Sequence, residues 1–484
     1  MPHMHDQFKQ NNCIFLNGRR VFKINLLQQE YSLLIAFPMD VLDFIVFFIW
    51  VFIFHIIFSI RRRRYNSDVL KKHHRRAFWL KVFSTFCFCM FLLYISPGDT
   101  TGLYYPEGVN IQQMIMKDPS KISILFESGA EFDQSQLANI DNSGYFEEES
   151  NFMVTRIVAI LSFLTFGQFM AINLIFSMVA FSGIWRLYRF FFEQYPHLSK
   201  QLAISILYLP TFVFWSSGIL KDPICVGALG WVTYSLYSIF YTRNNVFRNL
   251  LLFIFFAWLL VVLKIYILVS YLPFFILFLL LSNLKLVKHR LVKAFLVLAF
   301  LVMSIAGFLK ATESIGSALG KFAGEGITKS IKTYQANYAQ QEDLVESNFS
   351  LGVEFDGTPL SLIKIAPAAI VATLYRPFLW ESKKLSTLLS SLESLAMMLF
   401  TLYVILKTGI FRFVKTILRN PMVLYCFMFA IIFSLFVGAT TLNFGTLVRY
   451  KIPAMPFYLI ALFLILHINK KKKKSPAQGR TVVV

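Results

Sequence analysis

Charged side chains are scarce in this sequence: they make up 15% of its 484 residues, against 57% hydrophobic residues. A soluble protein of this length needs more charge to wet its surface, so the composition excludes a soluble globular protein. The chain instead contains apolar runs of about 20 residues, the length needed to cross a bilayer. Examples are Val41–Ile60, Gln168–Leu187, Leu291–Leu309 and Ile452–Ile468. The sequence therefore predicts an integral membrane protein with many crossings.

Acidic residues are also few, 26 against 47 Lys and Arg, which gives a formal net charge of +21. In a soluble chain this excess would suggest a nucleic-acid partner. Here most of the cations stand in blocks at the ends of apolar runs, where they orient helices in the membrane. We therefore expect membrane lipid, and no nucleic acid, as a partner.

Cysteine and histidine are too few and too scattered to form a disulfide framework or a metal site. The five cysteines are Cys13, Cys87, Cys89, Cys225 and Cys426. Four of them lie in apolar stretches, and the eight histidines lack the spacing of metal ligands. No metal ligand and no cofactor is therefore assigned, and the use of a divalent metal is left open.

Residues 1–38 lack a spanning run and also lack the n-, h- and c-regions of a cleaved signal peptide. They are polar and mixed in composition, and the first transmembrane run begins directly after Met39. One hypothesis is that Met39 is the biological start and that residues 1–38 form a leader that is not native. N-terminal sequencing of the native protein tests this, because a start before residue 39 contradicts it.

The basic blocks predict the orientation of the helices, because Lys and Arg are retained on the cytoplasmic side. The strongest blocks are Arg61–Arg64 and Lys470–Lys474. They predict an all-α transmembrane bundle of about eleven crossings over residues 39–470. One crossing is expected at about 200–219, and 249–283 is expected to form two short crossings that meet around Lys264–Pro273. The larger loops, about 96–166 and 310–390, then lie outside and carry short interfacial helices, whereas residues 471–484 form a cytoplasmic basic tail.

Several cations do not follow this rule, because they fall at or near the outer boundary. They are Arg156, Lys221, Lys264, Arg376, Lys383, Lys384, Arg449 and Lys451. Ionisable groups near membrane depth are costly and are usually paired or functional. Converging Arg and Lys side chains suit a phosphate or pyrophosphate group. The alternative for any single cation is contact with lipid headgroups or a local ion pair.

Two short polar motifs stand at expected outer helix ends. In Ser96-Pro97-Gly98-Asp99-Thr100, Pro-Gly ends the second helix, so Asp99 lies at the membrane surface. A carboxylate fixed there is a candidate general base towards an acceptor hydroxyl, or simply a local cap. The second motif, residues 215–223, lies on a hairpin tip. Its candidate substrate contacts are Trp215, Ser216, Lys221 and Asp222.

Two further motifs lie in the C-terminal half. Residues 375–381 combine a guanidinium, an aromatic platform and a carboxylate, in Arg376, Trp380 and Glu381. Residues 443–453 open the last helix from outside, and their cations Arg449 and Lys451 flank a tyrosine. Lys264 and Tyr266, at the expected turn within 249–283, are candidates to complete the site. For the motifs at 215–223 and 375–381 the alternative is an aromatic belt with an ion pair.

At these motifs the chain resembles the C-type superfamily of polyprenol-dependent glycosyltransferases, and more closely a bacterial branch found with polysaccharide gene clusters. The shared pattern is Gly-Asp-Thr at Asp99, Phe-Trp-Ser-Ser-Gly-x-x-Lys-Asp at 214–222, Arg-Pro-Phe-x-Trp-Glu at 376–381 and Arg-Tyr-Lys-x-Pro at 449–453. The order of the motifs and their common side carry the resemblance. It implies that Asp99 is the catalytic base and that the outer cations hold a lipid-linked sugar phosphate.

The leading hypothesis is a glycosyltransferase in the bacterial cytoplasmic (inner) membrane that builds cell-surface polysaccharide. It would move a sugar or oligosaccharide from a polyprenyl-phosphate carrier to a glycan acceptor on the outer face. Asp99 would deprotonate the acceptor, and cations would stabilise the departing phosphate. Those cations are Lys221, Arg376, Arg449 and Lys451.

Three alternatives remain. An O-antigen-type repeat-unit polymerase would use the same carriers and cations. A transporter or flippase is less favoured, because transporters place binding charges near the bilayer midplane in repeated halves. A non-catalytic assembly subunit is the last.

Overall fold

The computed structural model describes residues 13–16, 19–22, 39–139, 143–283, 291–292, 294–303, 306, 347–353, 359–382 and 385–474. The chain divides into two units, Met1–Ile45 and Val46–Val484. In the first unit, β1 (Cys13–Leu16) pairs antiparallel with β2 (Arg19–Phe22), with Cys13 opposite Phe22. Helix α2 begins at the end of this unit. The elements of the second unit are helices, so its fold is the predicted all-α bundle.

Seven helices in the described ranges are long and apolar enough to cross a membrane. They are α2 (Val41–Arg63), α3 (Asp68–Tyr94), α7 (Phe169–Gln194), α10 (Lys221–Tyr237), α11 (Val246–Asn283), α15 (Leu385–Thr408) and α17 (Pro421–Thr440). A bent pair, α18 (Phe444–Tyr450) and α19 (Met455–Lys474), makes an eighth span if the two helices count as one, with 62° between them. The chain is therefore a multi-pass membrane protein, with fewer candidate spans than the sequence predicted.

The difference has local causes. The crossing expected near 200–219 is two short helices, α8 (Ser199–Ile206) and α9 (Pro210–Trp215), because Pro210 cannot continue a helix. Of the crossing expected at 291–309, the described residues show only a short apolar helix, Ala294–Met303. Part of the loop expected at 310–390 is instead α14 (Pro359–Tyr375), an apolar helix that packs against α17. Thr373 of α14 donates to the Ser434 carbonyl across this contact.

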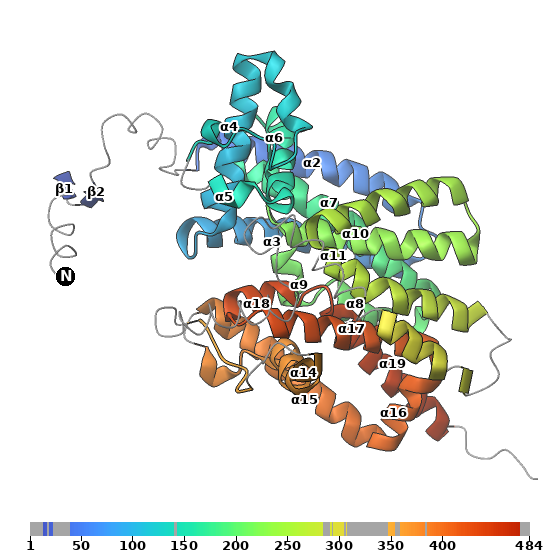
Figure 1. Cartoon of the computed structure of the whole chain (residues 1–484). Coiled ribbons are helices and arrows are strands. Elements are labelled where there is room, and N and C mark those ends of the chain that lie inside the picture. Colours follow the sequence, from blue (N-terminus) through green and yellow to red (C-terminus); the bar gives the residue numbers. More distant parts are fainter. Residues whose placement is uncertain are drawn as a thin grey trace, which may run out of the picture. The chain divides into compact units, whose positions relative to one another are not determined.

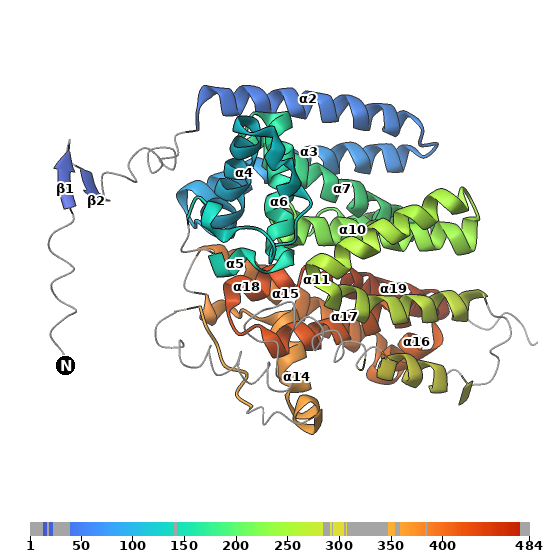
Figure 2. The same ribbon diagram turned by 45° about the horizontal axis from the view of Figure 1, so that its top comes forward.

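Helix α11 doubles back on itself at Lys264, whose backbone is not helical. Phe256 stacks on Trp231 of α10, with ring centroids 5.4 Å apart, and Tyr271 shares a 2.6 Å hydrogen bond with Thr233 of the same helix. In a straight helix Phe256 and Tyr271 would be about 22 Å apart. Both arms therefore lie along α10, as the ribbon shows (Figures 1 and 2). The break at Lys264 lies at the start of the expected range Lys264–Pro273, although the two arms count here as one candidate span.

Close helix contacts in the centre of the second unit depend on small residues. A Cβ added to Gly183 of α7 would collide with the Gly227 backbone of α10, and one added to Gly230 would collide with Gly183. Glycine lets the two backbones approach, which is a common way to pack helices where water is absent. This close α7–α10 contact fixes helix α10, whose first turn contains Asp222.

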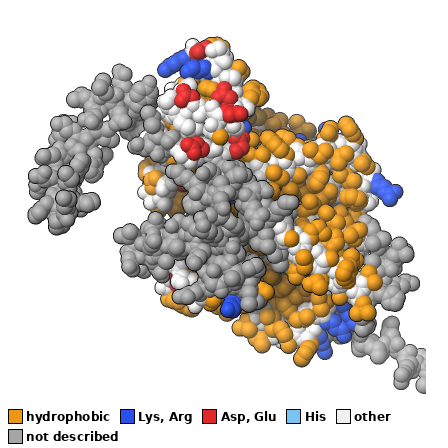
Figure 3. Space-filling model, viewed as in Figure 1, with side chains coloured by type: hydrophobic (Ala, Val, Ile, Leu, Met, Phe, Trp, Pro, Cys, Tyr) orange, Lys and Arg blue, Asp and Glu red, His pale blue; other side chains and the backbone are white. Residues whose placement is uncertain are grey.

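Helices α4 (Tyr105–Lys117), α5 (Ser143–Phe146) and α6 (Glu149–Thr165) lie between α3 and α7 in the sequence (Figure 1). Red acidic side chains gather over this region in Figure 3, whereas orange apolar side chains cover much of the neighbouring helix surface. The buried Glu107 carboxylate accepts hydrogen bonds from the Ala138 and Asn139 amides and so ties the connecting chain to α4. Phe166 and Gly167, both with positive φ, end α6 and turn the chain into α7.

Basic residues gather at one end of the second unit. The Arg61–Arg63 end of α2 is followed by Tyr65, which accepts a hydrogen bond from Trp185 of α7. The Arg189 guanidinium lies over the Tyr65 ring, 5.7 Å from its centroid. Because α3 runs from this turn towards Asp99, it separates the two groups by about 40 Å. The cations of these blocks and Asp99 are therefore at opposite ends of the bundle.

Candidate functional site

Asp99 lies just beyond the end of α3 and directly precedes the turn η2 (Thr100–Tyr104). The Thr100 hydroxyl donates 2.6 Å to the Ile219 carbonyl, which fixes this turn against the chain between α9 and α10. The Asp99 side chain is 40% exposed, and its Oδ2 accepts from Arg449 Nη1 at 3.3 Å. Two motifs that are 350 residues apart therefore meet at one carboxylate.

Arg449 also contacts a second, buried carboxylate. Its Nε donates at 3.3 Å to Oδ2 of Asp222, whose side chain is 1% exposed. Lys264 Nζ lies 2.6 Å from the other oxygen of Asp222, and 3.8 Å from the centroid of the Tyr450 ring. The position of Asp222 in the first turn of α10 favours its negative charge, because helix N-termini carry a partial positive charge. The non-helical backbone at Lys264 lets its ammonium group reach Asp222.

We call this group the Asp99 cluster: Asp99, Trp215, Asp222, Lys264 and Arg449. The Arg449 guanidinium lies 5.9 Å from the Trp215 ring centroid. Two carboxylates balance two cations, so the cluster has no net charge of its own. Within the part of the chain that the structure describes, Arg449 Nη2 makes no hydrogen bond. The cluster can therefore accept one further anionic or polar group at this donor.

Tyrosines lie within electrostatic reach of Asp99. Tyr145 donates 2.8 Å to Tyr104, which donates 3.1 Å to Asn151 of α6. Burial raises the pKa of both phenols, and the negative charge of Asp99 raises each pKa further. Both phenols therefore stay protonated at neutral pH, and their hydrogen bonds to each other and to Asn151 hold them in place.

Two predicted contacts on the second motif have structural partners instead. Lys221 Nζ forms an ion pair at 3.3 Å with Glu148, just before α6, and also contacts Ser150. It joins α10 to the loop helices. Ser216 is buried and accepts a hydrogen bond from Lys81 of α3. Neither side chain is in direct contact with Asp99.

The third motif forms its own ion pair. Arg376 binds Glu381 through Nε and Nη2, and its guanidinium lies 4.2 Å from the Phe349 ring centroid. The Trp380 side chain is 80% exposed and stacks on Phe378 at 4.9 Å. The structure thus places an exposed aromatic surface next to a paired guanidinium, but not within the Asp99 cluster.

The remaining predicted residues take structural positions nearby. Lys451 is buried, and its Nζ donates 3.0 Å to the Arg376 carbonyl and 2.9 Å to Ser394 of α15. Tyr266 stacks on Phe433 of α17 at 5.8 Å. Arg156 pairs with Glu149 at 3.2 Å. Lys383 and Lys384 lie outside the described residues.

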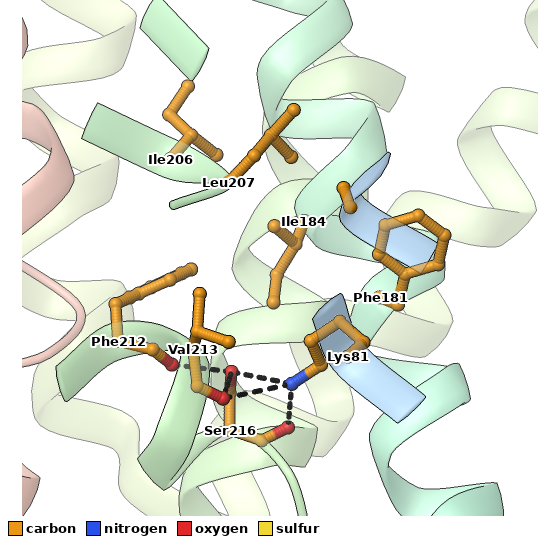
Figure 4. A pocket seen from close by; sticks show the side chains of 9 residues that line it. Lys81, Phe181, Ile184, Ile206, Leu207, Phe212, Val213 and Ser216 are labelled. Carbon is orange, nitrogen blue, oxygen red and sulfur yellow. Dashed lines mark hydrogen bonds between the residues drawn. The ribbon is translucent and has the colours of Figure 1, made fainter. Parts of the chain in front are cut away.

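Sequence reasoning missed a buried lysine, Lys81 in the middle of α3. Its Nζ lies 2.6–3.3 Å from neutral oxygens of residues 213–217, at the C-terminal end of α9. Figure 4 shows its contacts with Val213 and Ser216. These are the Val213 carbonyl, the Ser216 carbonyl and hydroxyl, and the Ser217 hydroxyl. The cavity beside Lys81 has an otherwise mainly apolar lining, including Phe181, Ile184 and Leu207.

A half-buried carboxylate contacts the other end of α9. Glu393 of α15 accepts from the Thr211 amide at 2.9 Å and from the Thr211 hydroxyl. The carboxylate at the N-terminus accepts from a free backbone amide, and the amine at the C-terminus donates to free carbonyls, so both satisfy groups that a helix end leaves unpaired. We call Lys81 and Glu393 the α9 clamp. The sequence did contain a signal for Lys81. An isolated ionisable residue inside an apolar helix marks a structural or functional position in membrane proteins.

No group of three or more His, Cys, Asp or Glu side chains in the described ranges is arranged to hold a metal ion. The fold defines a multi-pass, all-α membrane protein. Comparisons of the chain with protein-family models, with curated proteins and with solved structures gave no match. The resemblance carried by the four motifs therefore stays a prediction.

Proposed function

We propose that this protein is a membrane glycosyltransferase that moves a sugar or oligosaccharide from a polyprenyl-phosphate carrier to an acceptor. The observation that carries the proposal is the Asp99–Arg449 pair. It combines an accessible carboxylate with a guanidinium whose Nη2 makes no hydrogen bond to any described residue. Residues from four distant parts of the sequence are required to build the cluster, which supports a site rather than a chance surface pair.

The proposed reaction divides the work between these two side chains. Asp99 accepts the proton of the acceptor hydroxyl as its oxygen attacks the anomeric carbon of the donor sugar. The bond from that carbon to the phosphate oxygen breaks, and the polyprenyl phosphate leaves with the electron pair. Arg449 stabilises the charge that grows on this phosphate. When the phosphate binds Arg449, it competes with Asp99 for the guanidinium and so frees the carboxylate to act as a base.

The separation of charges along the bundle supports an extracytoplasmic site. Lys and Arg blocks are retained on the cytoplasmic side of membranes. Those blocks and Asp99 lie at opposite ends of α3. The proposed carrier would thus present its phosphate at the outer boundary, with its isoprenoid chain among the apolar helices.

The test is transfer from lipid-linked sugar donors in proteoliposomes, with the full chain, its Asp99→Asn variant and Asp133→Asn as a matched control. Asp133 is an exposed acid in the same loop region that contacts its own turn. General-base loss predicts a fall in turnover of about 100- to 10,000-fold for Asp99→Asn, and no change for Asp133→Asn. Equal turnover by wild type and Asp99→Asn would refute the role of Asp99. A ladder of product lengths would indicate the repeat-unit polymerase.

A second candidate, a transporter of lipid-linked glycan, is favoured by one specific observation. Helix α11 is broken at Lys264, and α8 and α9 form a second interrupted segment. Transporters often place binding sites at such broken helices. Movement of a labelled lipid-linked glycan between leaflets, without transfer of its sugar, would favour this function over the glycosyltransferase.

A further inference from the structure

A short helix between α15 and α17 has a sequence unlike its neighbours. This helix, α16 (Ile410–Arg419), follows Gly409, whose φ of +77° allows a sharp turn directly after α15. The Asn420 side chain caps the start of α17. The helix is too short to cross a bilayer, and it packs against α15, α17 and α19.

One face of α16 packs on the bundle. Its buried residues are Phe413, Thr416 and Ile417. The Phe413 and Phe427 rings lie 6.0 Å apart, and Asn469 of α19 donates 3.0 Å to the Thr416 hydroxyl. Asn469 directly precedes Lys470, the first residue of the C-terminal lysine run. His467 of α19 contacts His197, which follows the end of α7. Helix α16 therefore lies at the basic end of the bundle.

The rest of its surface divides into an apolar and a cationic sector. At 100° per residue, one sector contains Ile410, Phe411, Val414 and Leu418, which are all exposed, with Phe411 at 89%. The other sector contains exposed cations only: Arg412, Lys415 and Arg419. An exposed apolar sector beside a cationic one is the pattern of a helix that lies in a membrane interface.

The cations of α16 lack acidic partners on their own part of the chain. No Asp or Glu follows Glu393 in the 484-residue sequence, whereas the lysine run 470–474 adds positive charge beside α16. This excess favours an anionic partner. The adjoining apolar sector favours an amphiphile over a free anion, because acyl chains cover apolar side chains while headgroups meet the cations.

We infer that α16 is an interfacial helix that binds anionic phospholipid. Arg412, Lys415 and Arg419 contact the headgroup phosphates, while Phe411 and its apolar neighbours insert among the acyl chains of the same leaflet. This inference does not depend on the proposed transferase activity, since it concerns the opposite end of the bundle.

The test measures thermal stabilisation of the detergent-purified full chain by phosphatidylglycerol, with phosphatidylcholine and inorganic phosphate as parallel probes. The variant is Arg412→Gln/Lys415→Gln/Arg419→Gln, and the matched control is Arg61→Gln/Arg62→Gln/Arg63→Gln. The control removes the same charge from the same end. Each Lys or Arg near an anionic surface contributes roughly fivefold to the affinity, so removal of three should lower the apparent phosphatidylglycerol affinity by about tenfold or more. The control should lose less.

Equal losses in the two triple variants would overturn the inference, because attraction would then be spread over the whole basic end. Equal stabilisation by inorganic phosphate would identify a simple anion site and also overturn it. A second variant, Phe411→Ser/Val414→Ser, keeps every charge. Unchanged affinity there would refute insertion of the apolar sector. Unfolding of each variant without added lipid separates lost binding from a damaged fold.

Discussion

The Asp99 cluster and the α9 clamp both place ionisable groups within a membrane protein, but they satisfy them differently. In the cluster, each cation binds a carboxylate, and the Asp99–Arg449 pair is partly exposed. In the clamp, the buried Lys81 and the half-buried Glu393 bind the two ends of a short helix. A shared, accessible pair can exchange partners with a ligand, whereas a side chain bonded to backbone groups at a helix end is fixed in place. The Asp99 cluster is therefore the candidate site, and the α9 clamp is a structural element that holds α9 in position.

The two regions are joined by Trp215. This residue ends α9, which the clamp fixes, and its ring faces the Arg449 guanidinium of the cluster. The clamp thus determines where one wall of the candidate site lies. Substitutions in one region and then in the other show whether site and support are separate.

The largest expected effect comes from Lys81→Met, which leaves the α9 carbonyls and hydroxyls without their buried donor. We expect the free energy of unfolding to fall by about 3 kcal/mol, measured by denaturation in detergent. Lys71→Met is the matched control, because Lys71 pairs with Asp68 on the surface of the same helix. Its effect should stay within about 0.5 kcal/mol. A Lys81→Met protein as stable as wild type would show that the clamp does not hold α9.

Arg449→Lys should separate catalysis from stability in the cluster. Lysine keeps the positive charge but lacks the planar fork, so it cannot serve Asp99, Asp222 and a phosphate together. We expect turnover to fall by about 100-fold, with little change in unfolding. Steady-state kinetics in proteoliposomes measure the first quantity and denaturation the second. Loss of stability with intact turnover would reverse the assignment and make Arg449 a structural residue.

A smaller effect is expected for Lys221→Met, which removes the partner of Glu148. The loop helices should lose about 1 kcal/mol of local stability, because a hydrogen-bonded ion pair at their base is broken. Hydrogen exchange of the α6 amides measures this directly. Protection equal to wild type would mean that packing alone fixes the loop on α10.

The smallest effect concerns pH. Burial raises the pKa of Glu107 above its ordinary value of 4.5, so the folded loop binds this proton more tightly than the unfolded chain. Its contribution to stability is complete below pH 4.5 and is lost as pH rises through the folded pKa. The protection factors of the α4 amides, which are corrected for the intrinsic exchange rate at each pH, should therefore fall over this range in wild type. Glu107→Gln should remove this pH dependence of protection. The exposed acids Asp118 and Asp133 titrate in both proteins, so they do not contribute to the difference between them.

The sequence by itself determined the membrane class, the all-α fold and a break around Lys264–Pro273, because apolar run length and isolated charges report directly on crossing a bilayer. It also indicated four of the cluster's five residues through their motifs, and Lys264 through its position at a turn. It overestimated the number of spans, since hydropathy does not show that Pro210 divides one apolar run into α8 and α9. It missed α14, where Lys364 and Pro367 interrupt the apolar pattern.

Only the tertiary structure decided which charges meet. The sequence gives no reason to distinguish the outer cations Lys221, Arg376 and Lys451 from Arg449. In the structure each of the three has a partner outside the Asp99 cluster. Among the described residues, Arg449 of α18 is the cation that contacts both Asp99 and Asp222. Pairing depends on distances of a few ångströms between residues hundreds of positions apart. Composition and local motifs contain no such distances, so the packing of the helices has to supply them.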